Sequence, residues 1–127
     1  MAQTLLVGPE IETGREILRA LDDAKLKVSV AMWSVLSSYG DWRLVLSSSR
    51  LDSKGTQGAY HAVFEALDKA GFTIRDTESL VIFSMKDKFI RELRQVFAKA
   101  ASVEGMRLGG QTFGDRHIED AYVYRIS

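Results

Sequence analysis

The chain has 127 residues, of which 46% are hydrophobic and 27% charged, and its 17 basic and 17 acidic residues cancel at neutral pH. This length and composition predict one globular domain that spans residues 1–127 and has a core of its own. The balanced charge argues against a nucleic-acid binder, and the absence of cysteine excludes disulfides, thiolate catalysis and cysteine-ligated metals.

The N-terminal segment 1–7 has no basic region, and its apolar run stops at Gly8 and Pro9, so it lacks the features of a signal peptide. No stretch approaches the ~20 apolar residues that a membrane-spanning helix requires. We therefore expect a cytoplasmic protein with no membrane partner.

Apolar residues recur at helical spacing near the N-terminus and predict a first helix over residues 9–24. Two runs rich in aliphatic and aromatic residues, 28–36 and 42–46, flank the turn-forming segment 37–41 and predict a β-hairpin. The pattern does not fix its register, because a shift of one residue exchanges the two faces of a strand. The polar segment 47–58 follows and is expected to be a loop.

A second helix is predicted from an apolar stripe with Gly71 as its C-cap. The residues of this stripe are Tyr60, Val63, Phe64 and Leu67. The polar segment 73–79 is expected to be irregular or weakly extended. The apolar run 80–83 predicts a strand that is buried on both faces and hence central in the sheet.

A third helix over residues 86–101 is predicted from an apolar stripe, with Ser84 as its N-cap. Glycine-rich turns precede the alternating run 121–126, which predicts a last strand paired with a short one around 106–108. The order of elements is therefore α-β-β-α-β-α-β-β. This order predicts an α+β two-layer sandwich, with three helices on one face of a largely antiparallel sheet of four to five strands.

The loop before the second helix is a candidate anion site, because a helix N-terminus presents unpaired N–H groups and a positive dipole end. Its candidate residues are Ser48, Arg50, Lys54, Gly55 and Thr56. Their spacing is not that of a P-loop. The alternative is an exposed turn in which Ser53 or Thr56 caps the helix.

Trp33, Tyr39 and Trp42 surround the hairpin turn. On an uncovered sheet face they would form the kind of aromatic anchor that dominates protein interfaces. The alternative is ordinary core packing. We expect the protein to act by binding, as a homodimer or with a protein partner, through this open face.

Three further clusters favour structural roles over functional ones. The group Asp115, Arg116, His117, Glu119 and Asp120 offers acid–base or metal chemistry, but a solvated turn explains it as well. His61 and Glu65 suit a surface pair on the second helix. The basic residues Lys88, Arg91 and Arg94 offer a binding face for a polyanion, but a solvent-exposed face of the third helix explains them as well.

No nucleophile with a base, carboxylate pair or metal cluster stands at a diagnostic spacing, so no catalytic residue, metal or cofactor is predicted. Whether the protein is an enzyme stays open. The first hypothesis is a small interaction domain that associates with itself through the open sheet face. The alternative is a small-molecule or phosphate-ligand module, with or without catalytic activity, that uses the loop 47–58. The third is nucleic-acid binding through the basic face of the 86–101 helix.

Overall fold

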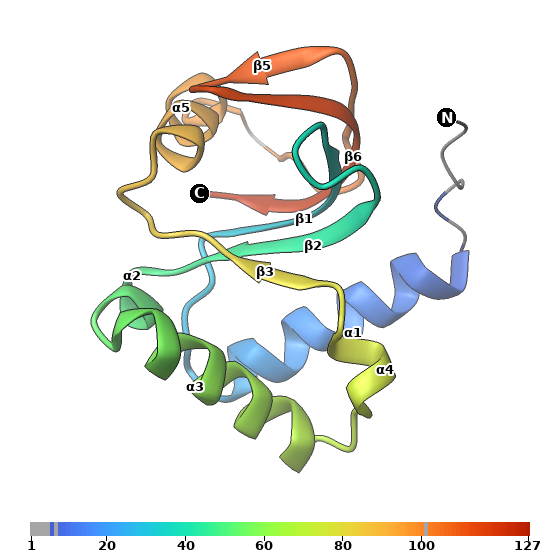
Figure 1. The fold of residues 1–127 in the computed structure, drawn as a ribbon, viewed down its shortest axis with the longest axis vertical. Coiled ribbons are helices and arrows are strands. Elements are labelled where there is room, and N and C mark those ends of the chain that lie inside the picture. Colours follow the sequence, from blue (N-terminus) through green and yellow to red (C-terminus); the bar gives the residue numbers. More distant parts are fainter. Residues whose placement is uncertain (1–5, 7, 101) are drawn as a thin grey trace.

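The computed structural model describes residue 6, residues 8–100 and residues 102–127, so most of the N-terminal segment used to argue against a signal peptide lies outside it. The elements, shown in Figure 1, are α1 (Gly8–Asp23), β1 (Val30–Leu36), β2 (Trp42–Ser47), α2 (Ser49–Asp52), α3 (Gly55–Lys69), α4 (Ile74–Thr77), β3 (Leu80–Ile82), α5 (Lys88–Phe97), β4 (Arg107–Leu108), β5 (Gln111–Phe113) and β6 (Arg116–Ile126). The predicted α+β class is confirmed.

The described strands form one mixed sheet in the order β3-β2-β1-β6-β4, with β5 paired to β6. β1 is antiparallel to both of its neighbours, whereas β2 and β3 are parallel. The prediction that the run 80–83 is central is wrong, since β3 lies at the edge and β1 is the central strand. Leu80 and Val81 still enter cores on opposite faces of the sheet, which explains an apolar run at an edge.

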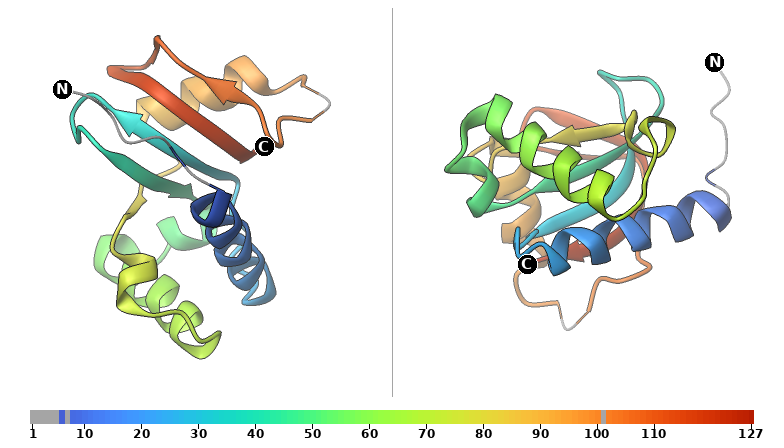
Figure 2. Two further views of the ribbon diagram at one scale, coloured as in Figure 1. Left: turned by 90° about the vertical axis from the view of Figure 1, so that its right-hand side faces the viewer. Right: turned by 90° about the horizontal axis from the view of Figure 1, so that it is seen from below.

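Helices cover both faces of the sheet, so the structure has three layers where two were predicted (Figure 2). α1 and α3 pack on one face, and α5 packs on the other. All seven residues of β1 are buried because alternate side chains enter the two cores. The open sheet face on which the interface hypothesis depended is therefore absent from the described residues.

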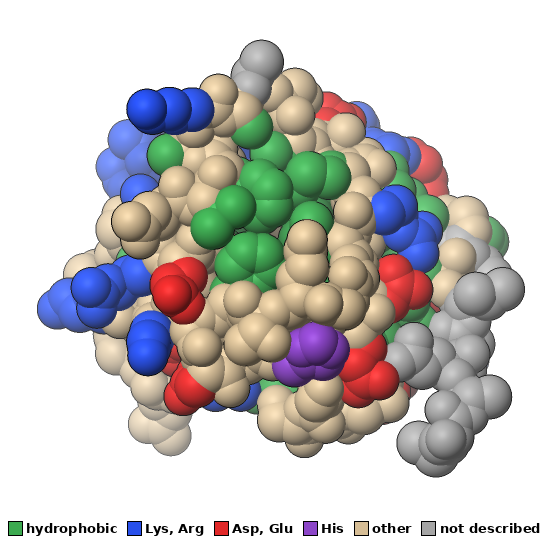
Figure 3. Space-filling view, turned by 90° about the horizontal axis from the view of Figure 1, so that it is seen from above, with side chains coloured by type: hydrophobic (Ala, Val, Ile, Leu, Met, Phe, Trp, Pro, Cys, Tyr) green, Lys and Arg blue, Asp and Glu red, His purple; other side chains and the backbone are tan. Residues whose placement is uncertain are grey.

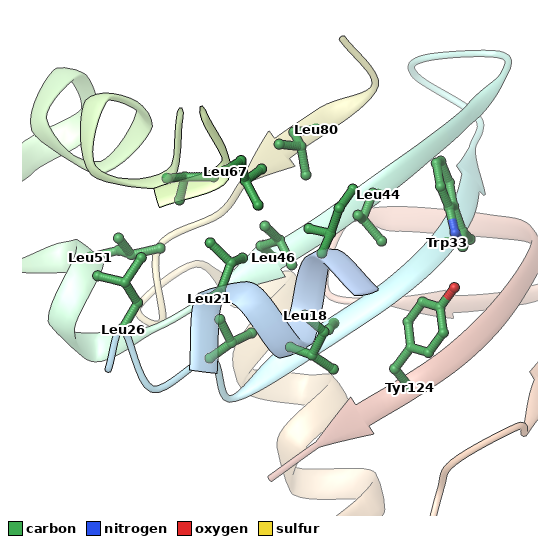
Figure 4. Close-up of a cluster of buried hydrophobic side chains, with 14 of the residues drawn as sticks. Leu18, Leu21, Leu26, Trp33, Leu44, Leu46, Leu51, Leu67, Leu80 and Tyr124 are labelled. Carbon is green, nitrogen blue, oxygen red and sulfur yellow. The ribbon is translucent and has the colours of Figure 1, made fainter. Parts of the chain in front are cut away.

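The side chains of Trp33 and Tyr124 come from two strands, and their polar ends point toward each other (Figure 4). Both hold the first turn of α1 against the sheet. Trp33 Nε1 donates to the Glu10 carbonyl at 3.2 Å, and Tyr124 Oη donates to the Ile11 carbonyl at 2.5 Å. Burial raises the pKa of Tyr124 to about 12. Gly14 faces both rings and leaves them the space to reach the helix backbone.

Local capping explains where the helices differ from prediction. α2 lies inside the segment predicted as a loop, and α4 inside the segment predicted to be irregular. A capping box of Thr73 and Asp76 starts α4. The N-cap of α5 is Asp87 rather than Ser84, because the Asp87 carboxylate accepts from the Phe89 N–H at 2.9 Å.

Candidate functional site

A tight turn reverses the chain between α3 and α4 and holds both helices beside the β3 edge. Gly71 has φ +92°, a left-handed conformation that favours glycine. The N–H groups of Gly71 and Phe72 donate to the carbonyls of Asp68 and Leu67 at 3.0 Å each, which is a Schellman motif. The predicted C-cap is therefore confirmed.

An open groove of about 590 Å³, which we name the α3–α4 groove, lies between α3, α4 and the edge strand β3. Large apolar side chains supply most of its wall: Phe64, Leu67, Phe72, Ile74 and Leu80. Ile74 is 85% exposed and Phe64 is 43% exposed. A concentration of exposed apolar surface in a folded domain is typical of a site that binds another molecule.

The α3–α4 groove carries unpaired negative charge. Asp68 and Glu78 line it, and its lining in the described structure includes no basic residue. Neither carboxylate forms an ion pair within the described part of the chain. Hydrogen bonds from Thr73 lower the pKa of the neighbouring Asp76, so the Asp76 carboxylate stays ionised at neutral pH. The groove thus favours a partner with apolar side chains and positive charge.

The prediction that Phe64 belongs to the buried stripe of α3 is wrong. The fully covered positions are Ala59, Val63 and Leu67, which recur every four residues. This stripe is too narrow to include Phe64, because α3 packs on α1 and on one border of the sheet. The Phe64 ring instead packs on Tyr60, with ring centroids 5.9 Å apart, and forms one wall of the groove.

The five residues of the predicted anion site do not meet in one place. Ser48 is fully buried and caps α2 by accepting from the Arg50 N–H at 3.1 Å. The Arg50 and Lys54 side chains are exposed, and Lys54 lines a separate hollow. Only Gly55 and Thr56 line the pocket at the N-terminus of α3.

That pocket, of about 220 Å³, opens where the parallel strands β2 and β3 end. The carboxyl ends of parallel strands are a common place for ligands. Asp52 accepts from the Met85 N–H at 2.9 Å and from Ser84 Oγ at 3.3 Å. Tyr60 Oη accepts from the Ile82 N–H at 3.0 Å. Sequence reasoning missed Asp52 and Tyr60 because their partners lie 33 and 22 residues away along the chain.

The structure places the two tryptophans of the interface hypothesis in the core. Trp33 is 6% exposed and Trp42 9%, and both contribute to the cluster under α1 and α3. Tyr39, in the hairpin turn, is 39% exposed, and the Arg43 guanidinium lies over its ring, 5.3 Å from the centroid. The three residues therefore form no continuous surface.

The acidic and histidine cluster lies on a hairpin, because β6 begins at Arg116 and pairs with β5. His117 Nδ1 lies 2.8 Å from Thr112 Oγ1 across this hairpin, and Asp120 pairs with Arg107 at 3.2 Å. In the part of the chain that the structure describes, no group of three histidine or acidic side chains is placed to hold a metal ion.

His61 and Glu65 form the surface pair that the sequence predicts. His61 Nε2 lies 3.3 Å from a Glu65 carboxylate oxygen, and both side chains are more than half exposed. A hydrogen bond from Lys69 is the main reason that the pKa of Glu65 is lowered. The three residues form an exposed charged row along α3 and enclose no site.

The outer face of α5 is basic. The segment 86–99 contains five basic and two acidic residues. Lys88 and Arg91 are exposed and form no ion pair with the described residues, whereas Arg94 Nε donates to the backbone carbonyl of the final residue at 2.7 Å. Val96 is 61% exposed. We name Lys88, Arg91 and Val96 the α5 surface.

These features define a small α+β domain with helices on both faces of its sheet, an open apolar groove and a small polar pocket. Comparison of the chain with protein-family models, with curated proteins and with solved structures finds no match. None of the described helices has the length and apolar character needed to cross a lipid bilayer. Function is therefore inferred from the α3–α4 groove, the pocket and the α5 surface.

Proposed function

We propose that the protein is a small binding domain whose α3–α4 groove receives an apolar, positively charged segment of another protein chain. The observation that carries the proposal is the pair Phe64 and Ile74, two exposed apolar side chains contributed by different helices to one groove. Full burial of such a side chain contributes roughly 1.5–3 kcal/mol. The proposal keeps the predicted interaction function but moves the surface away from the sheet, because helices cover both of its faces.

Photo-crosslinking in the native host tests this proposal. A photoreactive phenylalanine analogue at position 74 replaces one apolar side chain of the groove by another, and the same analogue at the exposed position 57 of α3 is the matched control. We expect an adduct of defined mass from position 74 and none from position 57. The absence of any adduct at position 74 would rule out binding at the groove.

A second candidate is a small anionic ligand in the pocket at the ends of β2 and β3. The observation in its favour is that Asp52 and Tyr60 fix the pocket wall while Thr56 and Lys86 line the space beside the α3 N-terminus. Inorganic phosphate at ~100 times its dissociation constant should add roughly 2.7 kcal/mol of stability. For a domain of this size, the melting temperature rises by about 10 °C.

The matched variants for this second candidate are Lys86→Ala and Lys54→Ala. Lys86 lines the pocket, whereas Lys54 lines a different hollow. Phosphate should raise the melting temperature of the wild type and of Lys54→Ala, but not that of Lys86→Ala. An unchanged melting temperature in the wild type would dismiss phosphate as the ligand.

A third candidate is a polyanion on the α5 surface, favoured by Lys88 and Arg91, which form no ion pair with any residue that the structure describes. Neutralisation of phosphates makes such binding steeply dependent on salt. Retention on heparin should therefore fall sharply between low and moderate salt. Equal retention at both salt concentrations would remove this candidate.

A further inference from the structure

Building on the proposed function, we propose that the α3–α4 groove receives the α5 surface of a second copy of this chain, so that molecules associate head to tail. The proposal names the partner that the groove binds. It rests on the position, the charge and the apolar character of the two surfaces.

The two surfaces lie at opposite ends of the molecule. Figures 1 and 2 place α3 and α4 at one end of the longest axis and α5 at the other. A molecule therefore cannot insert its own α5 into its own groove. Two copies stacked along the long axis bring one groove and one α5 surface together and leave one of each free.

The segments that form the two surfaces have opposite net charges. The segment 64–78, which forms most of the groove, has four acidic and two basic residues, and one of the basic residues, Lys69, already pairs with Glu65. The segment 86–99 has five basic and two acidic residues. The zero net charge of the chain thus includes one segment with a net negative charge at the groove and one with a net positive charge on α5, and no overall repulsion opposes association.

Apolar surface lies on the same helix as the positive charge. Val96 is 61% exposed, and the adjacent Phe97 packs on Phe113 with ring centroids 6.1 Å apart. Figure 3 shows hydrophobic side chains gathered on the end of the molecule where α5 and the β5–β6 hairpin lie, with both basic and acidic side chains around them. Val96 is an apolar side chain of suitable size to lie between Phe64 and Ile74 of the second copy.

The contact is heterologous, because the groove and the α5 surface are different parts of the chain. Such a contact does not close on itself unless its rotation generates a ring, and otherwise it builds open chains of molecules. One helix face against one groove is a small interface. We therefore expect association that is weak, that grows with concentration and that weakens as salt screens the opposed charges.

Two single-face variants test this geometry by sedimentation velocity over a concentration series. Ile74→Arg fills the groove and repels a basic partner, and Val96→Glu places a negative charge on the surface that faces the acidic groove. Both side chains are exposed in the monomer, so neither change opens the core. Gln57→Arg, on the exposed start of α3, is the control for added charge.

We expect the average mass of the wild type and of Gln57→Arg to rise past that of a dimer, while each single-face variant alone stays monomeric. An equimolar mixture of Ile74→Arg and Val96→Glu should form dimers and nothing larger, since one partner keeps an intact α5 surface and the other an intact groove. The contrary result is a mixture that stays monomeric while the wild type forms dimers and nothing larger. That result would overturn the head-to-tail contact, but it would not contradict binding at the groove. A wild type that is monomeric at every concentration also overturns this inference, and the crosslink at position 74 then decides the proposed function separately.

Discussion

Replacement of Gly14 by alanine tests how α1 packs against the sheet. A Cβ atom at this position would lie 2.6 Å from Trp33 Nε1 and 2.9 Å from Tyr124 Cζ, closer than van der Waals contact allows. Both rings are only 6% exposed, and their polar atoms donate to backbone carbonyls of α1. They cannot move aside without breaking these hydrogen bonds or leaving the core.

The expected loss of stability in Gly14→Ala is the balance of one favourable and two unfavourable contributions. Helix propensity alone makes alanine about 1 kcal/mol more favourable than glycine inside a helix. Overpacking of a filled core costs roughly 1–3 kcal/mol, and the loss of two hydrogen bonds costs about 1 kcal/mol each. The sum predicts that Gly14→Ala lowers the free energy of unfolding by roughly 2–4 kcal/mol. At roughly 4 °C per kcal/mol, the melting temperature falls by about 8–16 °C.

Thermal and urea denaturation followed by circular dichroism measure this loss. Gly8→Ala is the matched control, because a Cβ at that end of the same helix meets none of the described residues within 4 Å, and its effect should stay within about 0.5 kcal/mol. Gly14→Ala should also cost less in a Tyr124→Phe background, which lacks the hydroxyl oxygen nearest to the new Cβ. A Gly14→Ala protein as stable as the wild type would refute the close packing of α1.

Three further changes probe other contacts. Tyr60→Phe removes the acceptor of the Ile82 N–H on the β3 edge, so the free energy of unfolding, measured in urea, should fall by about 1 kcal/mol; an unchanged value would show that water replaces the bond without loss. Gly71→Ala forces alanine into φ +92° and should cost about 1–2 kcal/mol in the same assay. Because burial raises the pKa of Tyr124 from 10.0 to about 12, its contribution is complete below pH 10 and is lost as the pH rises towards 12. Melting curves at alkaline pH should therefore show a steeper loss for the wild type than for Tyr124→Phe, and equal losses would contradict the raised pKa.

The elements that the sequence predicts well are those set by local signals. The apolar spacing at the N-terminus predicts a helix over 9–24, and α1 spans Gly8–Asp23. The turn residues 37–41 predict the hairpin of β1 and β2. Gly71 and Phe72 predict a left-handed helix end, and the Schellman bonds form there. In each case the residues that determine the structure are neighbours in the chain.

The layers of the fold and the strand order depend on contacts between segments that are distant in the chain. The apolar periodicity of one segment does not predict which other segment it contacts. The apolar stripe of α5 predicts a buried helix face, but it does not indicate that α5 covers the opposite face of the sheet from α1. The run 80–83 is apolar because both faces of β3 are covered even at an edge, whereas its composition alone suits a central strand equally well. Asp52 and Tyr60 enter the pocket only because parallel pairing brings the end of β3 beside α2 and α3.

The mismatches between apolar pattern and burial fall on the residues that the binding proposal uses. Phe64 belongs to a helical apolar stripe and Ile74 stands in a polar segment, yet both are exposed in the same groove, and Val96 is exposed beside the basic face of α5. Sequences tend to break local consistency at functional sites and to keep it elsewhere. If these side chains served only the fold, replacing them with charged residues would change stability and leave association unaltered. Because they are already in contact with water in the monomer, we expect the reverse, a loss of association with little change in stability.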